Sequence, residues 1–171
     1  MSDTILKVTN VTKRFGGVCA LDNVNLELKK GEIHCLVGGN GSGKSTLIKI
    51  ISGFYKPDGG TVEIDGIRHT QKYSTMDAIA AGVQVIYQDM SVFPNLTVAE
   101  NIALTINKSE NKKLVNWKQV DEVAQQAFDK IGVQMPLHEL LEDMSVADKQ
   151  IVAIARAILY DAKLLIMDEP T

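Results

Sequence analysis

The chain has 171 residues, which fits one domain and is long enough to bury a substantial core. It is 45% hydrophobic and 23% charged, as is usual for a globular protein, and its formal charge of −3 gives no sign of a nucleic-acid-binding surface. It contains no run of about 20 apolar residues of the kind that crosses a bilayer. Cys19 and Cys35 lack metal-site spacing, and we expect them to be reduced thiols in the core.

The N-terminal part alternates apolar and polar residues, as half-buried antiparallel strands do. This pattern covers ILKVTNVTKRF and VNLELKK, with a turn at Gly16 and Gly17 between them, and it returns in TVEIDG. Three shorter runs, EIHCLV, VQVIYQ and LLIM, alternate less and predict strands that are covered on both faces.

Residues of the types that begin and end helices mark four helical patterns after residue 70. These residues are Ser74 with Asp77, Thr97 with Glu100, Asn116 with Gly132, and Ser145 with an end near Tyr160. The polar stretch NKSENKK between the second and third patterns predicts a surface loop. A β-rich beginning followed by a helical middle predicts an α/β core that carries inserts.

A glycine-rich segment, Gly38–Ser45 (GGNGSGKS), matches the pattern GxxxxGK[ST] between the expected strand EIHCLV and the helical run STLIKIIS. In such a loop successive backbone N–H groups point into one concavity, and the following helix adds its positive end. Lys44 can reach the β- and γ-phosphates, and the Ser45 hydroxyl can bind Mg²⁺. The segment therefore predicts a nucleotide phosphate site.

Two carboxylates, Asp168 and Glu169, follow the expected buried strand LLIM. Beside a phosphate loop, Asp168 can hold Mg²⁺ directly or through water, and Glu169 can orient and deprotonate an attacking water. The alternative is a solvated acidic turn before Pro170.

With both motifs present, the chain resembles ATP-binding cassette (ABC) ATPases over essentially its whole length. The resemblance implies an α/β fold: a P-loop NTPase core, an N-terminal antiparallel β-subdomain and an inserted α-helical subdomain. On this basis residues 1–30 and 60–70 form the antiparallel part of a single nucleotide-binding domain, 1–171. Residues 31–59, 83–90 and 160–171 form the core, and 95–150 the helical subdomain.

The resemblance also implies ATP and Mg²⁺ as cofactors and assigns residues to them. In KRFGG, Phe15 takes the place of the aromatic that stacks on adenine, although a core aromatic is the alternative. Gln88 takes the place of the Q-loop glutamine, which contacts Mg²⁺ or water and senses a transmembrane partner. The implied metal site is Ser45, Gln88 and Asp168, and the implied catalytic residues are Glu169, Gln88 and Lys44. The implied nucleotide-binding residues are Phe15, Gly38, Gly39, Asn40, Gly41, Ser42, Gly43, Lys44, Ser45 and Thr46.

The segment MSVADKQIVAIARAI is similar to the family signature LSGGQ with QRVAIARAL, which contacts the ATP of a partner cassette. Ser145 and Gln150 persist, but Val146 and Ala147 stand where the family has two glycines, and Asp148 replaces a glutamine. A β-carbon at Ala147 lies where the family brings backbone close to phosphate. We therefore expect the partner site built with this signature to be weakened or lost.

The stretches FGGVCALDNVNLELKKGEIH and MDAIAAGVQVIYQDMSVFPNLTVAENIAL most resemble the ATPases of ribose/galactose-type monosaccharide importers, which carry two cassettes in tandem. This resemblance implies the first cassette of an energy-coupling subunit, on the cytoplasmic face of the cell membrane. Its partners would be permease subunits, a second cassette and, indirectly, a periplasmic binding protein, with no nucleic acid. The alternatives are a nucleotide-binding module with little catalysis and a soluble, non-transport cassette ATPase of translation or DNA repair.

The family continues after its Walker B glutamate with a D-loop and a strand that ends in a switch histidine. His34, His69 and His138 all precede Glu169, so none of them takes that place. We therefore expect the front part of a longer ATPase, with an incomplete core sheet whose unpaired strand edges favour self-association. We also expect poor hydrolysis by this chain alone.

Overall fold

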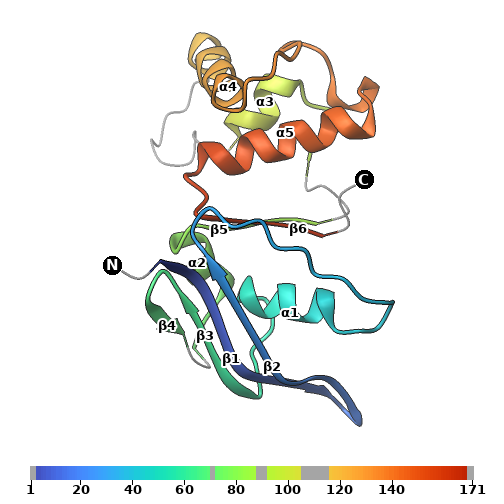
Figure 1. Cartoon of the computed structure of the whole chain (residues 1–171). Helices are drawn as coiled ribbons and strands as arrows, with labels where there is room; N and C mark the ends of the chain where they lie inside the picture. The colour runs from blue at the N-terminus through green and yellow to red at the C-terminus, as the bar shows by residue number, and fades with distance from the viewer. Residues whose placement is uncertain (1–2, 70–71, 88–91, 105–115, 169–171) are drawn as a thin grey trace. The chain divides into compact units, whose positions relative to one another are not determined.

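The computed structural model describes residues 3–69, 72–87, 92–104 and 116–168 (Figure 1). The chain divides into two compact units. The first contains the described residues of Met1–Val85 and Lys163–Asp168, and the second those of Ile86–Ala162.

The first unit is built on a four-stranded antiparallel sheet in the order β2-β1-β3-β4. Its strands are β1 (Thr4–Phe15), β2 (Val18–Lys29), β3 (Gly59–Ile64) and β4 (Ile67–His69). The three antiparallel strands predicted from alternation are confirmed, and the turn between β1 and β2 lies at Gly16 and Gly17. The short strand β4 was not predicted, because three residues carry too little periodicity.

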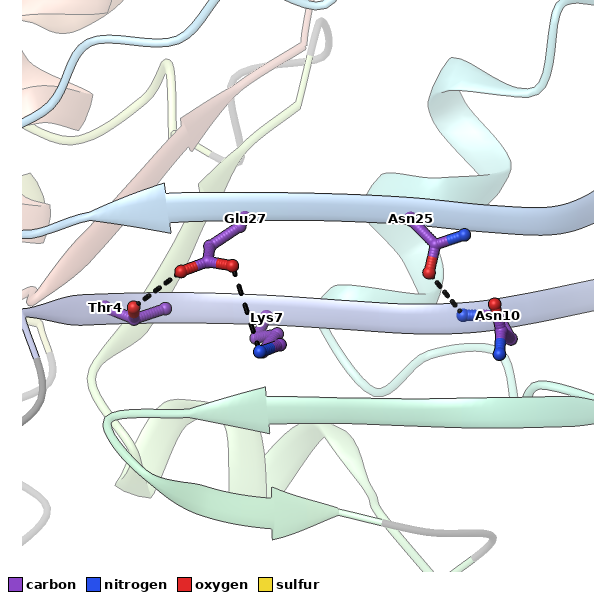
Figure 2. A network of polar contacts seen from close by, with 5 residues as sticks. All are labelled: Thr4, Lys7, Asn10, Asn25 and Glu27. Carbon is purple, nitrogen blue, oxygen red and sulfur yellow. Dashed lines mark hydrogen bonds and ion pairs between the residues drawn. The ribbon is translucent and has the colours of Figure 1, made fainter.

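A β-bulge at Asn10 bends the long central strand. Asn10 has a left-handed backbone (φ 51°), the register with β2 shifts there, and its N–H donates to Oδ1 of Asn25 at 2.9 Å (Figure 2). Gly60 packs against this bulge with φ +83°, and a β-carbon at Gly60 would lie 2.4 Å from the Asn10 carbonyl oxygen. Only glycine fits this backbone approach.

Farther along the same strand pair, Glu27 of β2 bridges two residues of β1 (Figure 2). Its Oε1 accepts a hydrogen bond from the Thr4 hydroxyl at 2.9 Å, and its Oε2 lies 3.9 Å from Nζ of Lys7. About half of each charged side chain is exposed, so this ion pair adds little stability.

Helices α1 (Lys44–Ile51) and α2 (Thr75–Ala80) share one apolar core with the sheet and with strands β5 (Val83–Ile86) and β6 (Leu164–Met167). The helix predicted to begin at Ser74 is confirmed, and its start forms a capping box, because Ser74 accepts the Asp77 N–H while Asp77 accepts the Ser74 N–H. The largest fully buried apolar side chains of this core are Val8, Val11, Ile50, Ile51, Val62 and Ile64.

Asp65, in the turn between β3 and β4, connects three segments of the first unit. Its carboxylate lies 2.7 Å from Nζ of Lys30, beyond β2, and 2.8 Å from Nζ of Lys163, before β6. The hydrogen bonds from Lys163 and Lys30 lower the pKa of Asp65 to about 2. The two lysines therefore favour the charged carboxylate at neutral pH.

The strand predicted for EIHCLV is wrong for this structure. Residues 33–40 have no regular secondary structure, and the Ile33 and Val37 side chains are 94% and 92% exposed. The physical reason is that a strand needs a neighbour to pair its N–H and C=O groups, and no described strand pairs with this segment. Cys19 and Cys35 are also exposed rather than in the core.

Strands β5 and β6 were predicted correctly, but their expected burial on both faces is not seen. Val83 and Leu164 are buried, whereas the other side chains are half-buried or, at Met167, 43% exposed. These strands pair only with each other among the described residues, so this two-stranded sheet buries fewer of its side chains than the apolar sequence pattern indicates.

The second unit is helical and consists of α3 (Val98–Ala103), α4 (Trp117–Ile131), the 3₁₀ turn η2 (Leu141–Asp143) and α5 (Val146–Leu159) (Figure 1). Thr97, Asn116 and Ser145 cap the three α-helices as predicted, and Gly132 ends α4 in a left-handed conformation. The fully buried side chains of its core are Val98, Ile102, Ala124, Ala127, Phe128, Leu141, Val152 and Ala155. The predicted loop NKSENKK lies outside the described residues.

A buried asparagine, Asn101, holds the segment that enters α3. Its Oδ1 accepts the Phe93 N–H at 2.8 Å, and its Nδ2 donates to the carbonyls of Phe93, Thr97 and Leu96 at 2.9, 3.0 and 3.2 Å. The Asn101 side chain is 0% exposed, and these contacts satisfy its polar atoms.

Candidate nucleotide-binding site

The glycine-rich loop leads directly into α1, as predicted. Lys44, the first residue of the helix, extends back over the loop, where its Nζ donates to the carbonyls of Gly38 and Gly39 at 2.6 and 3.0 Å. The Ser42 hydroxyl lies 3.5 Å from the same nitrogen. The ammonium group thus lies within the concavity of the loop. The oxygens of a bound phosphate would replace these carbonyls as the acceptors of its hydrogen bonds.

The N-terminus of α1 differs from those of the other helices. Helices α2, α3, α4 and α5 each have a Ser, Thr or Asn side chain that accepts a first-turn N–H. Helix α1 has no side-chain cap, because Gly43 precedes it, and its first turn contains no acidic residue. Its first N–H groups therefore have no side-chain cap among the described residues, which is the arrangement of an anion-binding helix end.

Gly43 is required where the loop meets the sheet. Its φ is +90°, and a β-carbon there would lie 2.6 Å from the Ala20 carbonyl oxygen and 2.7 Å from Cδ2 of Leu21. The loop can therefore lie this close to the start of β2 only with glycine at position 43. The close contact fixes the beginning of α1 relative to the sheet.

The residues expected to hold a metal ion are partly described. Ser45 is exposed in the first turn of α1, and Asp168 is half-buried directly after β6, in the same unit. A hydroxyl and a carboxylate are donors that suit Mg²⁺, which usually binds through one or two protein oxygens together with phosphates. Gln88 and Glu169 lie outside the described residues. Within those residues, no group of three His, Cys, Asp or Glu side chains forms a potential metal site.

Phe15 is the last residue of β1, and its side chain is 41% exposed. It pairs across the turn with Val18, which is 67% exposed, so both present apolar surface to solvent. An exposed aromatic ring agrees better with a ligand-stacking role than with the alternative of a core residue. Phe15, the glycine-rich loop and Asp168 all belong to the first unit.

The signature residues lie in the second unit, at the start of α5. Ser145 caps the helix by accepting the Asp148 N–H at 3.2 Å, and its hydroxyl donates to Oδ2 of Asp148 at 2.6 Å. Val146 and Ala147 are exposed, and Gln150 is half-buried. The Ser145 hydroxyl and the end of the helix dipole therefore already have a carboxylate as their partner.

Sequence reasoning missed the residues that surround Phe15, namely Lys13, Tyr55 and Asp58. The contacts of Asp58 with β1 span more than 40 residues of sequence. A single sequence carries no local signal for such a contact.

Comparisons with known proteins identify the family of this chain. A family model described as "ABC transporter" matches residues 21–171. The ribose import ATP-binding protein RbsA 2 of Burkholderia cenocepacia (strain HI2424) is 43% identical over 170 residues, which is 99% of this chain and 33% of the relative. A putative ribose/galactose/methyl galactoside import ATP-binding protein of Burkholderia ambifaria is 44% identical over 168 residues. The chain spans about a third of the length of these relatives.

Solved structures of cassettes have the same fold. The ATP-binding cassette MJ1267 of an ABC transporter, in its ADP conformation, has a TM-score of 0.82 and 29% identity over 99% of this chain and 70% of its own. The dimeric cassette MJ0796 in a post-hydrolysis state bound to ADP and Pi has a TM-score of 0.75 and 29% identity over 98% and 75% of the two chains. The family match, the relatives and the α/β fold agree, and the chain belongs to the ABC transporter family of ATP-binding cassettes.

Proposed function

We propose that this chain is the ATP-binding part of an energy-coupling ATPase of a monosaccharide importer. The observation that carries the proposal is the phosphate loop at an uncapped, uncharged helix N-terminus, with Lys44 inside it. The sugar class rests on the relatives, whose names specify ribose or ribose/galactose import.

In this function the loop amides and Lys44 hold the β- and γ-phosphates of ATP, and Phe15 stacks on adenine. The residues that would hold Mg²⁺ are Ser45, Asp168 and Gln88. When bound, the ion neutralises phosphate charge and orients the terminal phosphate. Glu169 accepts the proton of the attacking water as general base.

The partners follow from the same relatives and structures. Import ATP-binding subunits work with a membrane permease, and the dimeric MJ0796 structures support pairing between cassettes. No helix of the described residues has the length and apolar character needed to cross a membrane. We place the protein on the cytoplasmic face of the membrane, bound to permease subunits, with a periplasmic binding protein as an indirect partner. Copies of this chain are expected to self-associate through exposed Ile33 and Val37 and through the edges of β5 and β6, which pair with no further strand in the part of the chain that the structure describes.

A second function, a nucleotide-binding cassette with little catalysis of its own, is favoured by one observation. The Asp148 carboxylate binds the Ser145 hydroxyl at the start of α5. In a paired cassette, where this helix end would face phosphate, the carboxylate repels that phosphate and competes for the hydroxyl. The site that uses this signature would then bind ATP without fast hydrolysis.

The test is sugar uptake by the full-length protein reconstituted with its permease and its periplasmic binding protein in vesicles that contain ATP. We expect uptake of radiolabelled ribose by the wild type, and its loss in Glu169→Gln and in Lys44→Ala. Glu169→Gln should still bind Mg·ATP, whereas Lys44→Ala should not. Uptake that survives both substitutions contradicts the proposal. ATP binding and hydrolysis without uptake of any monosaccharide would favour the non-transport alternative.

A further inference from the structure

The exposed ring of Phe15 is held in place by two neighbours. The ring of Tyr55 packs against it in a T-shaped pair, with the two centroids 5.1 Å apart and the planes 65° apart. Nζ of Lys13 lies over the Phe15 ring, 5.4 Å from its centroid. Edge-on aromatic pairs and cations above a ring are both attractive arrangements. They limit the tilt and rotation of the ring, and 41% of Phe15 remains exposed for a ligand.

Asp58 fixes the cation over this ring. Its Oδ1 accepts from Nζ of Lys13 at 2.9 Å, and its Oδ2 accepts from the Arg14 N–H at 2.7 Å. The hydrogen bond from Lys13, followed by that from the Arg14 amide, lowers the pKa of Asp58. The Lys13 side chain is only 15% exposed, so it has little freedom to leave. A single carboxylate therefore restrains both the cation and the backbone next to Phe15.

Tyr55 is restrained in turn by α1. Its N–H donates to the carbonyl of Lys49 at 2.9 Å, and Nζ of Lys49 lies 5.6 Å from the centroid of the Tyr55 ring. The Phe54 ring packs against Tyr55 with the centroids 5.1 Å apart. Because α1 starts at the phosphate loop and ends just before these aromatics, one rigid helix links the phosphate loop to the support of the Phe15 ring.

We propose that Tyr55, Lys13 and Asp58 are positioning residues that fix the Phe15 ring as a platform for the base of a purine nucleotide. The inference rests on the proposed ATP-binding function and extends it to residues outside the phosphate loop. A flat aromatic base stacks on an exposed aromatic ring, and such stacking is sensitive to the orientation of the ring. A ring that is already oriented loses less conformational freedom when the base binds.

The experiment compares a ligand that has a nucleoside with one that lacks it. The dissociation constants of Mg·ATP and of Mg·tripolyphosphate are measured by calorimetry for the full chain and its variants, and the ratio of the two constants isolates the contribution of the nucleoside, which contains the base. The variants are Phe15→Ala, Tyr55→Leu, Tyr55→Phe and Asp58→Asn. The matched control is Lys7→Ala, which removes a lysine of the same strand that pairs with Glu27 rather than with the Phe15 support (Figure 2).

We expect Phe15→Ala to weaken Mg·ATP about tenfold, as the loss of one base-stacking contact does, and to leave tripolyphosphate unchanged. Tyr55→Leu and Asp58→Asn should shift the ratio in the same direction by about threefold or more. Tyr55→Phe, which keeps the ring edge, and Lys7→Ala should match the wild type. Thermal melts followed by circular dichroism establish that each variant is folded, and Tyr55→Phe provides a folded comparison if Tyr55→Leu unfolds.

The inference is wrong if Phe15→Ala shifts the ratio while Tyr55→Leu and Asp58→Asn leave it unchanged. It is also wrong if these two weaken both ligands equally, because the effect is then general to the fold, or if Phe15→Ala leaves the ratio unchanged. In each of these cases the assignment of the phosphate site is unaffected. If the wild type binds neither ligand, the proposed function and this inference both fail.

Discussion

Replacing Asn101 with leucine tests how the entry to α3 is held. The two side chains are similar in size, so the substitution exchanges a hydrogen-bonding group for an apolar one without opening a large cavity. Leucine leaves the Phe93 N–H without its acceptor and removes the amide donor from three backbone carbonyls, each of which keeps one backbone N–H as a donor. The position is 0% exposed, so water has little access to replace the lost contacts.

The cost can be worked out from these contacts. The Nδ2 group has two hydrogens for three acceptors, so the side chain makes the equivalent of three hydrogen bonds. At roughly 1 kcal/mol net for each of the two hydrogen bonds from Nδ2, and about 2 kcal/mol for the Phe93 N–H left without an acceptor, the loss reaches about 4 kcal/mol. Burial of the additional apolar surface of leucine recovers about 1 kcal/mol. We therefore expect Asn101→Leu to lower the free energy of unfolding by about 3 kcal/mol.

The assay is urea unfolding followed by circular dichroism, with Asn116→Ala as the comparison. Among the described residues, the Asn116 side chain accepts the Gln119 N–H as the helix cap, and loss of this bond should cost about 1 kcal/mol. The reasoning is refuted if Asn101→Leu costs less than Asn116→Ala, or if its stability equals that of the wild type.

Three further predictions concern the sheet, its charges and the signature helix. Gly60→Ala should lower the free energy of unfolding in urea by about 2–4 kcal/mol, because φ is positive and the new β-carbon would lie 2.4 Å from the Asn10 carbonyl oxygen. Gly17→Ala, whose β-carbon would have nothing within 4 Å, should cost under about 0.5 kcal/mol. Equal costs for the two variants would contradict the packing argument. The pKa of Asp65 is lowered from 3.8 to about 2, chiefly by Lys163, so the stability that the Asp65 carboxylate contributes is present above pH 3.8 and is lost as the pH falls toward 2. Asp65→Asn should therefore flatten the pH dependence of the urea midpoint over this range, and an unchanged slope would contradict this prediction. Asp148→Asn should strengthen Mg·ATP-dependent pairing of cassettes about two- to fivefold in analytical ultracentrifugation, and unchanged pairing would show that the carboxylate does not oppose phosphate.

The parts that sequence predicted correctly depend on local signals. The start of α3, marked by Thr97 and Glu100, and the two ends of α4, at Asn116 and Gly132, depend on groups within one or a few helical turns. Residue spacing alone therefore identifies them. The phosphate loop also has a local signal, because its glycines, its lysine and the following helix lie within a few residues of one another.

The parts that sequence missed depend on contacts between distant segments. EIHCLV has the composition of a buried strand, yet a strand forms only where another strand pairs with it, and Ile33 and Val37 are exposed here. The support of Phe15 by Tyr55 and Asp58 joins residues about 40 positions apart, and neither residue type indicates that contact by itself. Asn101 likewise looks like an ordinary helix residue until its burial is seen.

The measurement that tests the phosphate site most directly is calorimetric titration with Mg·ATP of the wild type, Lys44→Ala and Lys7→Ala. Lys44 donates into the loop concavity, whereas Lys7 lies on the surface of β1, so the pair separates a specific role from the loss of one positive charge. We predict binding by the wild type and by Lys7→Ala, and at least about tenfold weaker binding by Lys44→Ala. Equal affinity of all three proteins would show that ATP binds elsewhere and would contradict the assignment of the loop as the nucleotide site.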